Sequence, residues 1–269
     1  MERKNLSQIL KEAKIDYRRE YDRLYQIFYE LGTGQGDDVL RDSCAKCFWN
    51  MPMRGTCLSL DDFDEVYGIN FEKDPKDFDL NYLLNFCEYT YNLVIYISFN
   101  QWGYGFYSPK SVFQNQLNKV VELINYEFIS DDDTGVSILV PRKQEAIAVA
   151  EIVDKKLSYS VLEYNHHGLK GNLKKKKTIL KFMADDIEPQ RKVLNGSNKT
   201  LADNLFQMLQ KFVRHNNEEN LYIKGLSPDE LETCYDDIYQ MWLLAKLEID
   251  NLERKKRVEE TLKQINAKE

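Results

Sequence analysis

The amino-acid sequence predicts a mostly α-helical protein with an N-terminal helical region, one small β-hairpin and a C-terminal antiparallel four-helix bundle. Apolar residues recur every three or four positions along most of the chain, which is the spacing of a single helix face. Only 6 prolines and 12 glycines interrupt the 269 residues, and a pattern typical of two paired strands occurs once. We expect three parts, residues 1–125, 126–140 and 141–269, which could also form one continuous domain.

The overall charge of the chain bears on which kinds of molecule it can bind. The 37 basic and 44 acidic side chains give a formal net charge of -7, which argues against a protein that coats nucleic acid or an anionic membrane with its whole surface. Residues 2–5 are polar or charged, unlike a signal peptide. The most apolar stretch, residues 80–99, is interrupted by Asn85, Glu88 and Asn92 and makes a poor membrane span. We expect a cytoplasmic protein with no membrane partner.

The five cysteines are scattered, and Cys44 and Cys47 are the only close pair. A structural zinc site needs four thiolate or imidazole ligands, which usually come as two close pairs, and the second pair is missing. We expect reduced cysteines in or near a core, and no cofactor.

In the N-terminal half, the first predicted helix covers residues 5–31. Its apolar stripe runs from Leu6 to Leu31, and its opposite face is charged, so the stripe can pack in a core or dock a protein partner. Another long helix is expected to begin at Asp77 or Asp79. It is apolar on most sides, which predicts a central position.

After Pro141 the periodicity predicts four helices, at about residues 142–166, 172–195, 200–215 and from Ser227 towards the C-terminus. Pro189 is expected to bend or break the second helix. Ser227, Pro228 and Glu230 form a capping-box pattern for the fourth. Its distal part, residues 253–269, is highly charged and is expected to project or fray.

Short connections make consecutive helices antiparallel, so the ends of the four helices meet in pairs. One end of the bundle should then collect all three histidines, an arginine, several amides and several carboxylates. We expect a site here in which Arg214 stabilises charge, His215 or His166 moves protons and Asp236 orients an imidazole. The predicted ligand-binding residues at the same end are Asn165, Lys174, Lys175 and Asn217. Lysines 174–177 lie at a helix start, where the helix dipole disfavours them unless they meet an anion.

Two other interpretations of these residues stay open. Amides and basic residues suit the C-terminal ends of helices and acids suit the N-terminal ends, so the cluster could consist of caps and a core polar network, including a buried Arg214–Asp236 pair. A metal centre made by His166, His215 and either Glu232 or Asp236 is a smaller alternative. No closely spaced histidine pair supports it, and we expect no metal.

Arg214 followed by the polar His215 resembles the start of the motif of HEPN-type domains, the helical bundles of bacterial toxins and abortive-infection (antiphage defence) proteins. The resemblance covers residues 141–251. HEPN ribonucleases carry an arginine, often followed by a polar residue, and then a histidine four to six residues later, where this chain has Glu219, Asn220 and Leu221. The resemblance implies RNA cleavage in dimers, or an inactive recognition module.

These observations lead to two functional hypotheses. The first is a bacterial cytoplasmic defence or toxin-type protein that acts on RNA, a nucleotide or another phosphate-bearing ligand at the polar end of the bundle, with a metal-independent ribonuclease as the enzyme class. The alternative is a non-enzymatic helical interaction or scaffold protein. It would dock a partner through the Leu6–Leu31 stripe or the distal C-terminal helix, and a homodimer is among the partners considered.

Overall fold

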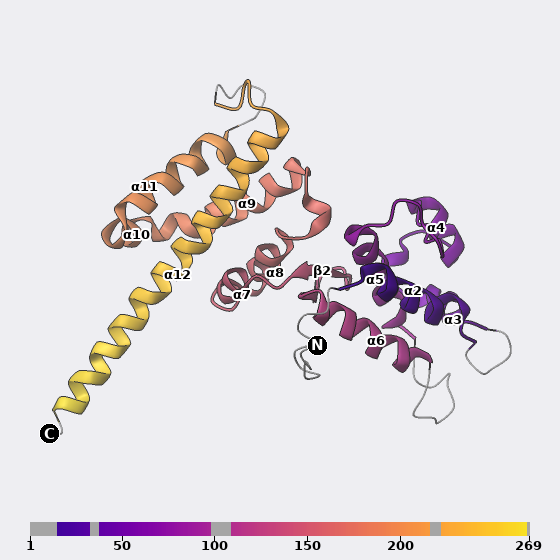
Figure 1. Ribbon diagram of the computed structural model, residues 1–269. Coiled ribbons are helices and arrows are strands. Elements are labelled where there is room, and N and C mark those ends of the chain that lie inside the picture. Colours follow the sequence, from indigo (N-terminus) through magenta and orange to yellow (C-terminus); the bar gives the residue numbers. More distant parts are fainter. Residues whose placement is uncertain (1–14, 33–37, 98–108, 216–221, 268–269) are drawn as a thin grey trace, which may run out of the picture. The chain divides into compact units, whose positions relative to one another are not determined.

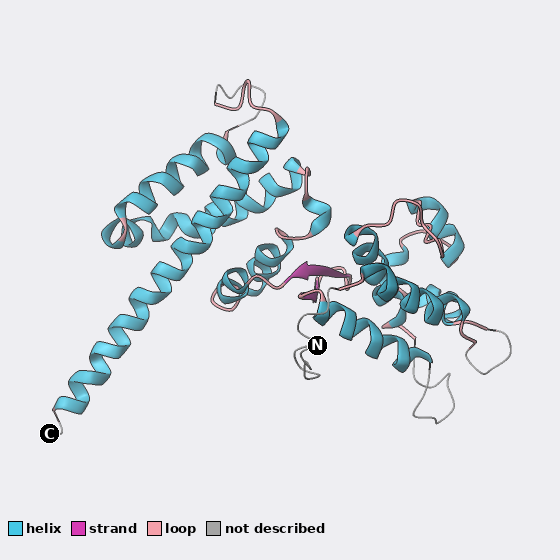
Figure 2. Ribbon diagram, viewed as in Figure 1, coloured by secondary structure: helices cyan, strands magenta, loops and turns pink. Residues whose placement is uncertain are grey.

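The computed structural model describes residues 15–32, 38–97, 109–215 and 222–267. The chain divides into two compact units, Met1–Pro141 and Arg142–Glu269. Within the described ranges, helices dominate both units and one pair of short antiparallel strands accompanies them (Figures 1 and 2), which confirms the mostly α fold. None of the described helices combines the length and the apolar composition that a membrane span requires.

The N-terminal unit contains the predicted strand pair, helices within both predicted helical stretches, and further helices between and after them. Its elements are α2 (Tyr17–Tyr25), the π-helical η1 (Gln26–Glu30), α3 (Leu40–Cys47), the 3-10 turns η2 (Phe48–Asn50) and η3 (Pro52–Arg54), α4 (Leu60–Tyr67), α5 (Leu80–Val94), α6 (Pro109–Leu123), β1 (Tyr126–Ser130) and β2 (Ser137–Pro141). The Asp79 carboxylate caps α5 by accepting a hydrogen bond from Tyr82 N at 2.8 Å.

Helix α5 lies at the centre of this unit, as its apolar composition predicts. The Phe86 ring contacts the rings of Tyr21, Tyr25 and Phe28 with centroids 5.0–6.4 Å apart. In the described part of the first predicted helix, α2 with η1, the apolar stripe buries Tyr21, Leu24 and Phe28 in the core, whereas Leu31 after it is exposed. The start of that stripe, at Leu6, lies outside the described residues.

The hairpin is part of the N-terminal unit because polar contacts tie it to α5. Strands β1 and β2 pair with Phe128 opposite Leu139. Asn92 donates from Nδ2 to Ser137 O at 2.7 Å and accepts at Oδ1 from Ser137 N at 2.8 Å. Glu88 accepts a hydrogen bond from Leu139 N at 2.9 Å. The free edge of β2 is thus satisfied by side chains of one helix.

All five cysteines are free thiols. Four are buried and Cys234 is half-buried, as expected for reduced residues in or near a core.

The C-terminal unit consists of α7 (Gln144–Ala150), α8 (Lys155–Glu163), the 3-10 turn η5 (His167–Leu169), α9 (Leu173–Ile187), the 3-10 turn η6 (Glu188–Gln190), α10 (Arg191–Ser197), α11 (Lys199–Met208), the π-helical η7 (Leu209–Arg214) and α12 (Pro228–Asn266). The prediction of one continuous helix over residues 142–166 is wrong. Asp154 accepts hydrogen bonds from Lys156 N and Leu157 N and starts a new helix there, since a capping aspartate competes with helix continuation. The break at Pro189 is confirmed.

Helix α12 is the central helix of this unit and packs against α7, α9, α10 and α11. The Ser227–Glu230 capping box starts it as predicted. Trp242 is fully buried and donates from Nε1 to Met183 O at 2.8 Å, which joins α12 to α9. Beyond Asp250 the helix continues past the other helices of this unit, and nearly every residue from 251 to 267 is exposed (Figure 1).

Candidate functional site

The polar ends of α8, α9 and α12 meet in the C-terminal unit around one buried ammonium group. Lys176 Nζ lies 2.8 Å from Glu232 Oε1 and 2.7 Å from Asp236 Oδ1. The lysine side chain is only 8% exposed, whereas that of Asp236 is 50% exposed. A buried charge needs close partners, and these two carboxylates supply them.

Glu232, one of the two acids that bind Lys176, is kept in its ionised form. Glu232 Oε1 also accepts a hydrogen bond from Gly171 N at 2.8 Å, in the turn before α9. Burial opposes ionisation, but the hydrogen bonds from Lys176 and from the Gly171 amide outweigh it and lower the pKa of Glu232. Glu232 therefore acts as a permanent negative partner at neutral pH.

Two stacked tyrosines pack beside this network and take part in its hydrogen bonds. The rings of Tyr164 and Tyr239 lie 4.2 Å apart with an interplanar angle of 7°. Tyr164 donates its hydroxyl proton to Asp236 Oδ1 at 2.9 Å, and Tyr239 donates to Val161 O at 2.8 Å. Burial, with the neighbouring Asp236 charge, raises the pKa of Tyr164, and burial raises that of Tyr239. Both phenols are therefore neutral hydrogen-bond donors at physiological pH.

Asn165, a predicted ligand-binding residue, belongs to this network. Its Nδ2 donates to Tyr239 Oη at 2.6 Å. The amide thus joins the end of α8 to α12, and this contact is a structural one.

Arg214 lies apart from Asp236, so the suggested pair of these two residues is not formed. Its guanidinium binds Glu188 Oε2 at 2.8 Å and Ala184 O at 3.5 Å. Both acceptors belong to the C-terminal end of α9 and the turn after it, whereas Lys176 lies near the start of that helix. Arg214, the last residue of the π-helical turn η7, therefore binds at this end of α9 and not to Asp236 of α12.

The two predicted proton carriers have separate partners. His215 is exposed, and its Nε2 lies 3.2 Å from Gln210 Nε2. His166 caps the turn η5 by accepting from Gly168 N at Nδ1, 3.2 Å away. Asp236, the expected partner of an imidazole, is instead bound by Lys176 and Tyr164. Asn217 lies outside the described residues.

Of the two remaining predicted residues, Lys174 belongs to a basic strip on the surface and Lys175 does not. Lys174 and Lys181 are exposed on α9, and Lys177 between them donates from Nζ to His215 O at 2.7 Å. Lys175 instead forms an ion pair with Glu163 at 3.0 Å. We call Lys174, Lys177, Lys181, Arg214 and His215 the basic strip.

The sequence prediction did not identify Lys176 as the buried centre of this polar network. A signal was available, since Lys176, Ile179, Leu180 and Met183 share the spacing of the buried face of α9. A lysine at such a position must bury its stem and find an acidic partner.

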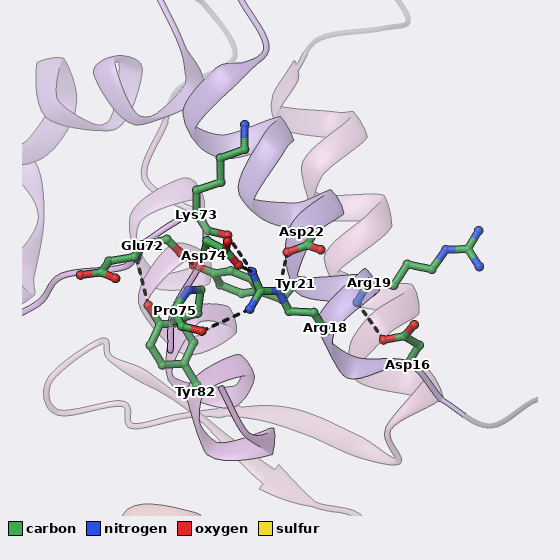
Figure 3. Close-up of polar contacts among 10 residues, drawn as sticks. All are labelled: Asp16, Arg18, Arg19, Tyr21, Asp22, Glu72, Lys73, Asp74, Pro75 and Tyr82. Carbon is green, nitrogen blue, oxygen red and sulfur yellow. Dashed lines mark hydrogen bonds and ion pairs between the residues drawn. The ribbon is translucent and has the colours of Figure 1, made fainter. Parts of the chain in front are cut away.

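A pocket of about 430 Å³ lies in the N-terminal unit and is lined by Arg18, Asp22, Tyr25, Gln26, Glu30, Lys73 and Asp74. Figure 3 shows the hydrogen bonds made by Arg18, one of these lining residues. The guanidinium donates to Asp22 Oδ1, Lys73 O, Asp74 Oδ1 and Pro75 O at 2.6–3.3 Å. Its donors are thereby used to hold the segment of residues 72–75 against α2, so Arg18 acts as a structural clamp.

A smaller pocket of about 180 Å³ lies between α8 and α9, lined by Asp154, Lys156, Leu157, Ser160, Phe182 and Asp186. The predicted catalytic and ligand-binding residues do not line it. Comparisons with protein-family models, with curated proteins and with solved structures gave no match to this chain.

Proposed function

We propose that this protein binds RNA, or another polymer of phosphate groups, along the basic strip of the C-terminal unit. The strip follows the exposed side of α9 and crosses onto η7, which packs against α9. Lys174 and Lys181 are seven residues apart, which corresponds to about 10 Å along a helix. This is longer than one phosphate group, so the strip suits a polymer better than a single phosphate.

The main observation in favour of this proposal is that two lysines, Lys177 and Lys181, lie close together on α9. These like charges are four residues apart on one helix face, an arrangement that costs helix stability. Burial, together with the charge of Lys181, lowers the pKa of Lys177. In a chain with a net charge of -7, positive charges kept together against this cost are well explained by a bound polyanion.

The proposal concerns binding. Arg214 forms an ion pair with Glu188, and Asp236 binds Lys176 and Tyr164. These contacts do not support proton transfer between the predicted catalytic residues. RNA cleavage, the resemblance to HEPN-type domains and a role in bacterial defence remain predictions.

Fluorescence anisotropy with a labelled single-stranded RNA tests the binding. We expect Lys174→Gln/Lys181→Gln to weaken binding about tenfold and to lower the slope of log K against log salt concentration by about 1.4, because two phosphate contacts are lost. The matched control is Lys192→Gln/Lys199→Gln, which removes the same charge from exposed lysines of α10 and α11. Equal affinities of the two double variants, or no anisotropy change with the wild-type chain, would overturn the proposal.

The same RNA, analysed on a denaturing gel after incubation, tests the separate prediction of cleavage. Arg214→Ala/His215→Ala should abolish cleavage if these residues are catalytic. If the wild-type chain leaves the RNA intact while binding it, the catalytic hypothesis is lost and the binding proposal stands.

A further inference from the structure

The distal part of α12, residues 251–266, carries an apolar stripe that the rest of the C-terminal unit leaves exposed. Val258, Leu262 and Ile265 are 56%, 52% and 51% exposed. They are separated by four and then three residues, so they lie on one face of the helix. Leu244, 55% exposed, continues the same face towards the bundle.

This spacing is that of a coiled-coil seam. Leu262 occupies an a position, and Val258 and Ile265 occupy the d positions on either side of it. A segment of this length without tertiary packing is marginal as a helix, because helix nucleation is costly and its stability comes mainly from an amphipathic face packed on a partner. The rest of the segment is polar or charged except for half-buried Leu252.

We propose that the distal α12 segment pairs with the same segment of a second copy as a parallel, in-register two-stranded coiled coil. In that arrangement three apolar layers form, each from the same residue of both copies. Arg254 is then at a g position and Glu259 at the following e position of the partner, so one pair of opposite charges forms on each side of the seam. Arg254 now binds Asp250 within its own helix at 2.6 Å, an exposed ion pair that costs little to exchange.

The number of apolar layers decides against the antiparallel arrangement. Antiparallel pairing aligns a with d positions, so Leu262 meets either Val258 or Ile265 of the other copy and only two apolar layers form, whereas the parallel pair forms three. With Val258 opposite Leu262, Glu259 also lies next to its own counterpart and Ile265 meets Lys255. Lys255 at an a position also limits the number of strands, because a lysine there can reach solvent past one partner helix but not from the core of a larger bundle.

Sedimentation equilibrium of the full chain over a concentration series tests the self-association. We expect a monomer–dimer equilibrium, and we expect Leu262→Asp to raise the dissociation constant by at least about tenfold, since the change places two carboxylates in an apolar layer. Gln264→Asp adds the same charge to the opposite side of the helix and should leave the constant unchanged. A monomer at every concentration, or equal weakening by both substitutions, overturns the proposal.

Disulfide trapping tests the parallel orientation. In a Cys234→Ser background, Ile265→Cys should form a covalent dimer with oxidised glutathione, because equivalent d positions face each other in a parallel pair. Gln264→Cys should not. A dimer in sedimentation without the Ile265→Cys disulfide overturns the parallel arrangement. The proposal is independent of RNA binding, since Lys174→Gln/Lys181→Gln should dimerise like the wild-type chain.

Discussion

Lys176 Nζ lies 2.7 Å from Asp236 Oδ1, and this contact joins the first turns of α9 to the start of α12. The same ammonium binds Glu232, and Asp236 also accepts the hydroxyl of Tyr164. One buried lysine therefore connects three helix ends of the C-terminal unit.

We expect Lys176→Met to lower the free energy of unfolding by about 2–3 kcal/mol, because two carboxylates lose the cation that binds them. The half-exposed Asp236 can recover some hydration, which keeps the loss below that of a fully buried pair. Urea denaturation followed by circular dichroism measures the change. The neighbouring Lys174→Met is the control, since Lys174 is exposed and its loss should cost less than about 0.5 kcal/mol. Similar costs for both variants would contradict the assigned role of Lys176.

The acid limb of the stability curve should depend on Glu232. Its pKa is lower in the folded chain than in the unfolded one, so its contribution is fully present above the ordinary glutamate pKa of about 4.3 and is lost as pH falls through the folded-state value. Glu232→Gln should therefore reduce stability at pH 7, and the difference from wild type should shrink below about pH 4. Unfolding free energies measured from neutral to strongly acidic pH give this comparison. A difference that stays constant over that range would show that the Glu232 charge is not what stabilises the fold.

Asn92 should be the main attachment of the hairpin to α5. Asn92→Leu leaves the buried N–H and C=O of Ser137 without these partners, and we expect a loss of about 2–4 kcal/mol. Hydrogen exchange at the Ser137 amide should accelerate in the variant. Asn118→Leu on the exposed side of α6 is the matched substitution and should change neither quantity appreciably. Unaltered exchange at Ser137 in the Asn92 variant would refute this attachment.

Arg18→Lys should loosen the segment of residues 72–75 while preserving the charge, because one ammonium cannot replace a guanidinium that binds several acceptors at once. Limited proteolysis with a glutamate-specific protease, which cleaves after Glu72, should then be faster than in the wild-type chain. Arg19→Lys is the control, since Arg19 is exposed and its side chain points away from this segment in Figure 3. Equal cleavage rates in the two variants would exclude the clamp.

Several described helices begin at a residue that the sequence predicts as a cap, since a cap is a local interaction between a side chain and amides two or three residues away. Asp79 and Ser227 each cap the helix that the sequence pattern places after them. The central position of α5 and the free cysteines also follow from composition alone. The break at Asp154 shows the limit, because a capping aspartate inside an apolar pattern can end a helix or remain on its surface, and packing decides between these outcomes.

Tertiary structure alone decided which polar residues meet. Residues 174–177 are four identical lysines, and only the rotation of α9 against α12 turns Lys176 inward to two carboxylates while Lys174 stays in solvent. Arg214, the last residue of the π-helical turn η7, likewise reaches Glu188 instead of Asp236. The order of the helices in the chain is enough to predict which helix ends meet. It does not predict how each helix is rotated about its axis, and that rotation decides which side chains contact one another.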